Sequence, residues 1–198
     1  MNVRKATIDD VEKIVKIHCD AFNGFFLTSL GSDFLKFYYG CFIKSIETIA
    51  LVAVENDVIY GFSASTMNCK GFNTRLIKSN LFSFGLFYIK LMITSPMSLV
   101  RLLKNLTKKS DEIEDNEDYA ELYSIGVSKD VQGKGVGKIL LYVTEKEMKI
   151  SGVKRLSLTT DYNNNESTLG FYRSMGYETL YEFITYPNRK MFRLIKTL

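Results

Sequence analysis

The sequence predicts a single α/β domain built on a mixed β-sheet. The length of 198 residues suits one domain with a substantial core, and the content of 46% hydrophobic and 24% charged residues is that of a globular protein. Short β-branched apolar segments alternate with segments of helical periodicity, which is typical of α/β folds. Because we find no internal repeat and no linker, we expect one domain over 1–198.

The N-terminal part has the patterns of a strand, two helices and a hairpin. Apolar residues recur at helical spacing after a pair of capping aspartates, and two β-branched segments flank a short polar turn. The expected elements are a strand at 2–6, a helix that Asp9 or Asp10 caps, a helix at 32–45, and strands at 48–54 and 58–65 joined by Glu55-Asn56-Asp57.

The C-terminal part alternates strands and helices more tightly. Glycines follow both expected helices at the positions where helices commonly end. The expected elements are a strand at 119–127, a helix at 135–151 before Gly152, a strand at 154–160, a helix at 165–175 before Gly176, and a final hairpin of 177–185 and 189–195 around Pro187-Asn188.

A long insertion, about 67–118, separates these two parts. We expect a helix near 75–93, a break at Ser95-Pro96 and another helix near 97–108. Eight basic residues and no acidic residue lie between Lys70 and Lys109, and an acidic run at 111–118 follows directly. A nucleic-acid binder would usually show a basic patch without such an acidic companion, so we expect no nucleic-acid partner.

Two interpretations of the basic and apolar segment 70–109 stay open. The favoured one is an additional helical layer that packs on the sheet or pairs two subunits in a homodimer. The alternative is contact with an anionic membrane surface, or with a lipid-linked or phosphorylated acceptor. The longest apolar stretch, roughly 81–93, is too short to span a bilayer, and no secretory leader is evident. We therefore expect a soluble, cytoplasmic protein.

Cysteine and histidine usage predicts neither a disulfide framework nor a metal site. Cys19, Cys41 and Cys69 are odd in number and widely spaced, so we expect buried free thiols. His18 is the only histidine and falls on the apolar face of the first helix. A packed, hydrogen-bonded histidine is therefore favoured over a catalytic one.

The segment Gln132-Gly133-Lys134-Gly135-Val136-Gly137 lies between an expected strand and an expected helix. Alternating glycines let successive amides point inward at a positive helix end, which is a site for phosphate oxygens. Lys134 and Lys138 can add positive charge. A glycine-rich turn without a ligand is the structural alternative. A Walker loop is excluded because Ile139 follows Lys138, and the glycine spacing does not fit a dinucleotide fingerprint.

This loop resembles the Gln/Arg-x-x-Gly-x-Gly/Ala motif of the GNAT acetyltransferase superfamily. A second segment, from Asn165 to Tyr177, resembles the family's Asn-x-x-Ala-x-x-x-Tyr-x-x-x-Gly-Phe motif, with Thr168 in place of Ala and Tyr177 in place of Phe. The two motifs are correctly ordered and separated by a strand. The resemblance covers about residues 2–195, and its specific part is confined to 121–177. It implies a GNAT fold, mostly antiparallel and splayed between the fourth and fifth strands.

The resemblance also implies acetyl-CoA as co-substrate. The amides of Gln132–Gly137 would hold the pyrophosphate, and backbone groups of Ile125 and Val127 would bond the pantetheine arm as an added strand would. Gly126 suits a bulge that frees the Val127 amide to polarise the thioester carbonyl. Asn165 would bond the arm, cap its helix, or do both.

Two residues are candidates for proton transfer. Tyr172 matches the family's tyrosine and is the candidate acid for the departing thiolate, with core packing as the structural alternative. Glu121, at the start of the central strand, is the candidate base for the amine, and a solvated strand-end charge is the alternative. Asp161, just past a strand end, could orient the acceptor.

The expected reaction moves acetyl directly to a primary amine of a small molecule, because no cysteine occupies a recognisable nucleophile position. Residues 22–31, rich in Phe and with Thr28 and Ser29 as polar contacts, would shape the acceptor site. A loose resemblance to a GNAT branch associated with surface-polysaccharide assembly suggests an amino sugar. The alternatives are a non-catalytic acyl-CoA-binding regulatory module, an assembly protein that relies on 70–109, and an acyltransferase that uses a longer acyl-CoA.

Overall fold

A seven-stranded mixed sheet organises the protein. The computed structural model describes residues 1–94, 115–185 and 188–198. The strand order is β1-β2-β3-β4-β5-β7-β6, in which only β4 and β5 run parallel. The strands are β1 (Asn2–Lys5), β2 (Thr48–Glu55), β3 (Val58–Thr66), β4 (Ala120–Val127), β5 (Arg155–Asp161), β6 (Glu178–Thr185) and β7 (Arg189–Thr197).

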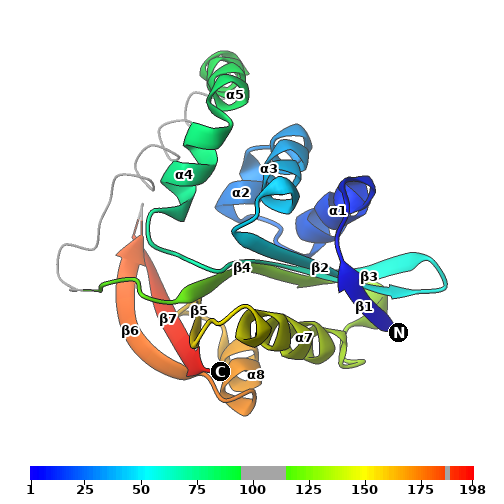
Figure 1. The fold of residues 1–198 in the computed structure, drawn as a ribbon, viewed down its shortest axis with the longest axis vertical. Coiled ribbons are helices and arrows are strands. Elements are labelled where there is room, and N and C mark those ends of the chain that lie inside the picture. Colours follow the sequence, from blue (N-terminus) through cyan, green and yellow to red (C-terminus); the bar gives the residue numbers. More distant parts are fainter. Residues whose placement is uncertain (95–114, 186–187) are drawn as a thin grey trace.

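Helices cover both faces of this sheet (Figure 1). One face carries α1 (Val11–Ala21), the short α2 (Phe26–Ser29), α3 (Ser32–Lys44), α4 (Phe72–Ser79) and α5 (Leu81–Thr94), and the other carries α7 (Val136–Ile150) and α8 (Glu166–Ser174). The 3-10 turns η1 (Ile8–Asp10) and η2 (Lys129–Val131) precede α1 and α7. Two buried apolar clusters, one on each side of the sheet, form the core. The predicted fold class is confirmed.

The insertion differs from its prediction. In place of one helix near 75–93, two helices meet at Asn80, whose backbone leaves the helical region and whose side-chain Nδ2 donates to the Leu76 carbonyl at 3.0 Å. Asparagine competes for local backbone acceptors in this way, which explains the break. The second expected helix, 97–108, lies outside the described residues.

The sequence predicted that Asp9 or Asp10 caps the first helix. Asp10 lies at the N-cap of α1, but its side chain makes no capping hydrogen bond. Its carboxylate instead accepts from both terminal nitrogens of Arg4 at 2.7 and 2.9 Å and from the Thr7 amide at 2.7 Å. The hydrogen bond from Arg4 lowers the pKa of Asp10. This aspartate therefore fastens the edge strand β1 to the start of the first helix.

His18 is a packed core residue, as the favoured interpretation predicted. It is 2% exposed, and its Nδ1 lies 2.8 Å from the Tyr39 hydroxyl, while its Nε2 has no partner among the described residues. Burial lowers the pKa of His18 to about 4. The ring is therefore neutral at physiological pH.

The buried ring predicts a pH-dependent stability. Below its unfolded pKa of about 6.5 the unfolded chain binds a proton that the folded chain refuses, so stability falls between pH 6.5 and 4, by about 3 kcal/mol at most. His18→Asn retains an acceptor or donor near Nδ1 without a titrating ring. Urea unfolding across this pH range should show a flatter profile for His18→Asn, and parallel profiles for the two proteins would contradict the assignment.

Candidate active site

A cleft opens where β4 and β5 part. Their parallel ladder pairs Ala120–Leu122 with Leu156–Leu158, and β4 then continues to Val127 while β5 continues to Asp161. The cleft between them has a volume of about 320 Å³. Among the predicted site residues it is lined by Ile125, Val127, Gln132, Asn165 and Tyr172, so the structure brings both sequence motifs to one place.

A bulge in β4 explains the parting, and it lies three residues before the predicted position. Ala64 of β3 pairs with Ser124 and Ser65 pairs with Leu122, which leaves Tyr123 as the extra residue. A bulge bends and twists its strand, and here it coincides with the last residue that pairs with β5. Gly126 stays in regular pairing with Phe62.

Gly126 therefore has a different reason to be glycine. A Cβ at this position would lie 2.7 Å from Cε1 of the buried Phe62 ring. The close approach of the ring excludes any side chain there. The prediction of a bulge at Gly126 was wrong. A glycine within a strand indicates either a bulge or the close approach of another group, and here the second alternative applies.

The glycine loop presents several unpaired amides at the N-terminus of α7. Gly133 and Gly135 have φ values of +78° and +80°, which L-residues with a side chain rarely adopt. In the described chain, five amides of this loop donate to no protein acceptor, namely those of Gly133, Gly135, Val136, Gly137 and Lys138. Such a group of donors at the positive end of a 15-residue helix suits an anion.

Two of the predicted loop contacts are already used within the protein. The Lys134 amide donates to the Val131 carbonyl at 3.2 Å, and the Gln132 amide donates to the Lys129 carbonyl at 3.4 Å. The Lys134 ammonium donates to the Asp130 carbonyl at 3.2 Å. Gln132 still lines the cleft with its side chain, and Lys138 keeps its amide free.

Tyr172 and Asn165 lie on the α8 side of the cleft. Tyr172 is buried beside the rings of Phe171 and Tyr177, and burial raises the pKa of its phenol, so the hydroxyl is protonated at neutral pH. Asn165 makes no side-chain cap. Its Nδ2 donates to the Thr160 hydroxyl at 2.7 Å and to the Asp161 carbonyl at 2.8 Å, which fixes the start of α8 against the end of β5.

Glu121 faces away from this cleft and is not solvated. One carboxylate oxygen accepts from Nη1 of Arg193 at 2.9 Å and the other from the Cys69 thiol at 3.0 Å. Burial, reinforced by the charge of Glu121, raises the pKa of Cys69, which keeps the thiol protonated. With both oxygens occupied, Glu121 is poorly placed to act as a base, and neither of its expected roles fits this geometry.

Arg193 is the centre of a polar cluster that the sequence did not reveal. Its Nη1 also donates to the Ser157 hydroxyl at 3.1 Å, and its guanidinium lies 5.5 Å from the Tyr119 ring centroid. The hydroxyls of Tyr119 and Tyr181 both donate to Asp115. These groups come from segments far apart in the sequence, and no local motif brings them together.

The expected acceptor side is lined by aromatic rings. Phe22 and Phe25 reach the cleft, and Met191 of β7 lies there too. Asp161 is held by both its oxygens on Arg189, whose guanidinium also lies 4.5 Å from the Phe25 ring centroid. The Thr28 and Ser29 hydroxyls, expected to contact the acceptor, donate instead to the Phe22 and Phe26 carbonyls at 2.6 Å.

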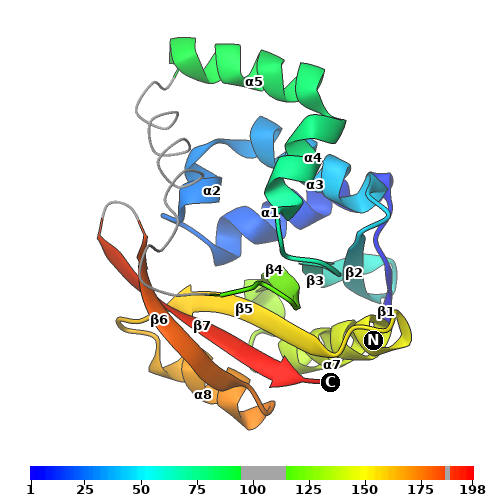
Figure 2. The same ribbon diagram turned by 60° about the vertical axis from the view of Figure 1, so that its left-hand side comes forward.

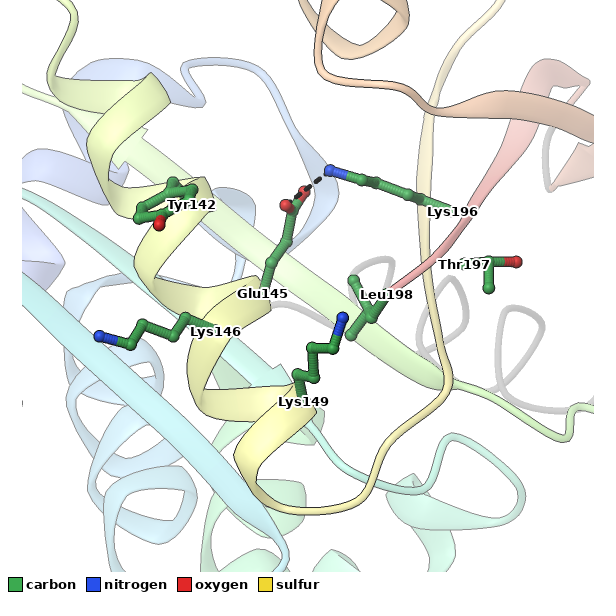
Figure 3. A pocket seen from close by; sticks show the side chains of 7 residues that line it. All are labelled: Tyr142, Glu145, Lys146, Lys149, Lys196, Thr197 and Leu198. Carbon is green, nitrogen blue, oxygen red and sulfur yellow. Dashed lines mark hydrogen bonds and ion pairs between the residues drawn. The ribbon is translucent and has the colours of Figure 1, made fainter.

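A second hollow of similar size lies elsewhere, between the C-terminal half of α7 and the end of β7 (Figure 3). The Lys196 ammonium donates to Glu145 at 2.6 Å across it, and Lys146 and Lys149 lie along its helical side. It includes no residue of the glycine loop or of the two sequence motifs. The β4–β5 cleft, which both sequence motifs reach, is therefore the candidate active site.

The comparisons with known proteins agree with this geometry. Residues 99–177 match the model described as the acetyltransferase (GNAT) family. No curated protein matches the chain by sequence.

Solved structures match the fold over essentially its whole length. A ribosomal-protein-alanine N-acetyltransferase from Brucella melitensis is 15% identical with a TM-score of 0.65, and the match covers 100% of both chains. PaiA N-acetyltransferase from Thermoplasma acidophilum, solved in complex with coenzyme A, is 15% identical with a TM-score of 0.61, over 100% of this chain and 98% of that one. An aminoglycoside 6'-acetyltransferase of type Ii is 15% identical with a TM-score of 0.62, over 100% and 97%.

The buried pair of Arg193 and Glu121 predicts a large stability effect. Their side chains are 12% and 10% exposed, so Arg193→Met should leave an unpaired buried carboxylate and cost about 3–5 kcal/mol in urea unfolding. Adding Glu121→Gln should recover part of that loss. Lys190→Met, which breaks a more exposed pair with Glu182, is the matched control and should cost much less. Equal losses for the two single variants would contradict the prediction.

Proposed function

From the place of residues 99–177 in the GNAT acetyltransferase family, we propose that the protein moves acetyl from acetyl-CoA directly to a primary amine of a small molecule. The observation that carries this proposal is the set of five unpaired amides at the start of α7, directly beside the cleft that β4 and β5 leave open. One whole catalytic domain, 1–198 with its insertion at about 67–118, belongs to the same proposal, as does a cytoplasmic location.

The chain's own groups would hold the co-substrate in two parts. The amides of Gly133, Gly135, Val136, Gly137 and Lys138 would donate to the diphosphate, aided by the helix dipole. The β4 backbone from Tyr123 to Val127, where the ladder to β5 has ended, would bond the pantetheine arm in the manner of an added strand. The Val127 amide remains our candidate to polarise the thioester carbonyl.

Tyr172 would serve the departing thiolate. A thiol has a reference pKa near 8.5, below that of any phenol, and burial raises the pKa of Tyr172 further. The hydroxyl therefore acts first as a hydrogen-bond donor that stabilises the thiolate charge as it develops. The phenol transfers its proton completely only if the same apolar surroundings also raise the pKa of the coenzyme thiol.

Glu121 receives a structural role in this proposal. Its oxygens accept hydrogen bonds from Arg193 and Cys69, so neither oxygen is free to take a proton from the amine. The amine would lose its proton to water in the cleft. Glu121 instead neutralises the buried guanidinium of Arg193, which β7 places beside β4.

An amino sugar is the acceptor we propose to test first. The rings of Phe22 and Phe25 offer flat apolar surfaces at the acceptor end, and Ser124 and Thr159 add hydroxyl groups to the lining. A peptide N-terminus is the competing acceptor, since one of the similar structures is a ribosomal-protein-alanine acetyltransferase. Thiol release from acetyl-CoA across a panel of amino sugars, aminoglycosides and peptides would separate these classes. No release with any amine would favour a non-catalytic acyl-CoA-binding module.

The glycine loop provides a charge-specific test of coenzyme binding. Gly135 has φ +80° at the N-cap of α7, where Asn and Asp fit about equally well in shape. We expect Gly135→Asp to weaken CoA binding at least tenfold relative to Gly135→Asn, because only Asp adds a negative charge beside the diphosphate. Isothermal calorimetry measures the affinities, and the melting temperatures of the two variants should be similar. Equal CoA affinities would exclude this loop as the diphosphate site.

The role of Tyr172 is tested by removing one oxygen atom. We expect Tyr172→Phe to lower kcat by about 10²-fold or more, because such proton-donating groups contribute 10²–10⁴-fold, while CoA affinity changes little. Tyr177→Phe removes a buried hydroxyl from a residue that does not line the cleft, and it is the matched control, expected to keep kcat. An unchanged kcat for Tyr172→Phe would remove the tyrosine from the mechanism.

A further inference from the structure

Helix α5 is apolar around its whole circumference. Its sequence from Leu81 to Thr94 contains one charged residue, Lys90. A helix of this kind is normally covered by protein or lipid on every side. One side is covered here, because Phe84 packs on the Phe37 ring of α3 at 4.8 Å between centroids and Phe87 packs on Phe34 and Phe37 at 5.8 and 4.9 Å.

The opposite side of α5 is open to solvent. Phe82 and Ile93 are 80% and 79% exposed, and the open residues fall on two adjacent helical stripes. The first stripe is Phe82, Leu86, Ile89 and Ile93, and the second is Leu81, Tyr88 and Met92. We call these seven side chains the α5 apolar face. They run along the helix for about 18 Å at 1.5 Å per residue.

This face lies at one extremity of the molecule. Both views place α5 at one end of the molecule, farther from the sheet than α3 (Figures 1 and 2). At 14 residues α5 is too short to cross a bilayer, and none of the helices in the described part of the chain has the length and apolar character of a membrane span.

The charge around α5 indicates what such a surface carries. The sequence from Lys70 to Lys109 holds eight basic residues and no acidic one. Lys70 and Lys78, which lie before α5, are exposed and form no ion pair in the described ranges. A second copy that docked the same face would bring two such basic segments together. An anionic surface would gain from both the charge and the apolar side chains.

We propose that the α5 apolar face binds the surface of an anionic membrane, with the helix lying in the plane of the interface. Leucine, isoleucine and phenylalanine side chains would enter the boundary between headgroups and acyl chains, where Tyr88 suits the interface. Lys78, close before α5, would add roughly 1 kcal/mol near an anionic leaflet. The two contributions together give reversible attachment without a spanning segment. This proposal assigns the membrane alternative to the exposed side of α5, while the other side packs on α3 as part of a helical layer.

Liposome flotation of the full chain tests this proposal. We expect flotation with vesicles of phosphatidylcholine containing about 30% phosphatidylglycerol, weaker flotation with phosphatidylcholine alone, and a decrease as salt rises. Phe82→Glu/Ile89→Glu should lower the membrane partition coefficient at least tenfold. Tyr142→Glu/Ile150→Glu is the matched control, because it places the same charges on exposed apolar positions of α7. Far-UV circular dichroism and melting temperature should be unchanged in both variants, which shows that each is folded.

Three outcomes would overturn the proposal. The wild-type chain could fail to float with anionic vesicles, or both double variants could float equally well. Light scattering could also show that the wild-type chain is a dimer without lipid and that Phe82→Glu/Ile89→Glu is a monomer, which would make the face a subunit interface. None of these results touches the binding of CoA at the α7 N-terminus, so this test and that of the proposed function fail separately.

Discussion

The site depends on the three-residue parallel ladder between β4 and β5. The ladder holds Ala120–Leu122 against Leu156–Leu158, and the bulge at Tyr123 then turns β4 away. Because β4 leaves its neighbour at this point, its backbone can serve as the edge of an otherwise continuous sheet. Beyond this bulge, β4 leads to the N-terminus of α7. The unpaired strand edge and the unpaired loop amides therefore lie next to each other.

The sheet needs support where its strands separate, and the cluster around Arg193 provides it. Arg193 belongs to β7, yet it bonds Glu121 of β4 and Ser157 of β5, so one side chain links three strands beside the ladder. Burial alone would lower the pKa of Arg193, but the charge of Glu121 raises it above its ordinary value. Tyr119 and Tyr181 enclose the guanidinium with their rings and bond Asp115 with their hydroxyls.

The local signals of the sequence predicted the elements well, because each strand and helix of the C-terminal part is bounded by glycine or polar turns. They also predicted that Gln132 and Tyr172 would share a cleft. They failed where the answer depends on partners distant in sequence. Glu121 could not be assigned without Arg193, which is 72 residues away. Gly126 could not be explained without the Phe62 ring, and the exposed side of α5 could not be known before its packing on α3.

The bulge at Tyr123 and the glycine loop share a property that bears on how this fold diverges. Both present main-chain groups to the cleft, and main-chain groups do not change when residues are exchanged. Under the proposed function, recognition of the coenzyme would therefore depend chiefly on backbone shape, through a few glycines and one irregular strand. The remaining surface can drift with little constraint. A chain can then keep this architecture over its whole length at 15% identity, as seen with the Brucella melitensis protein, while its acceptor specificity evolves separately.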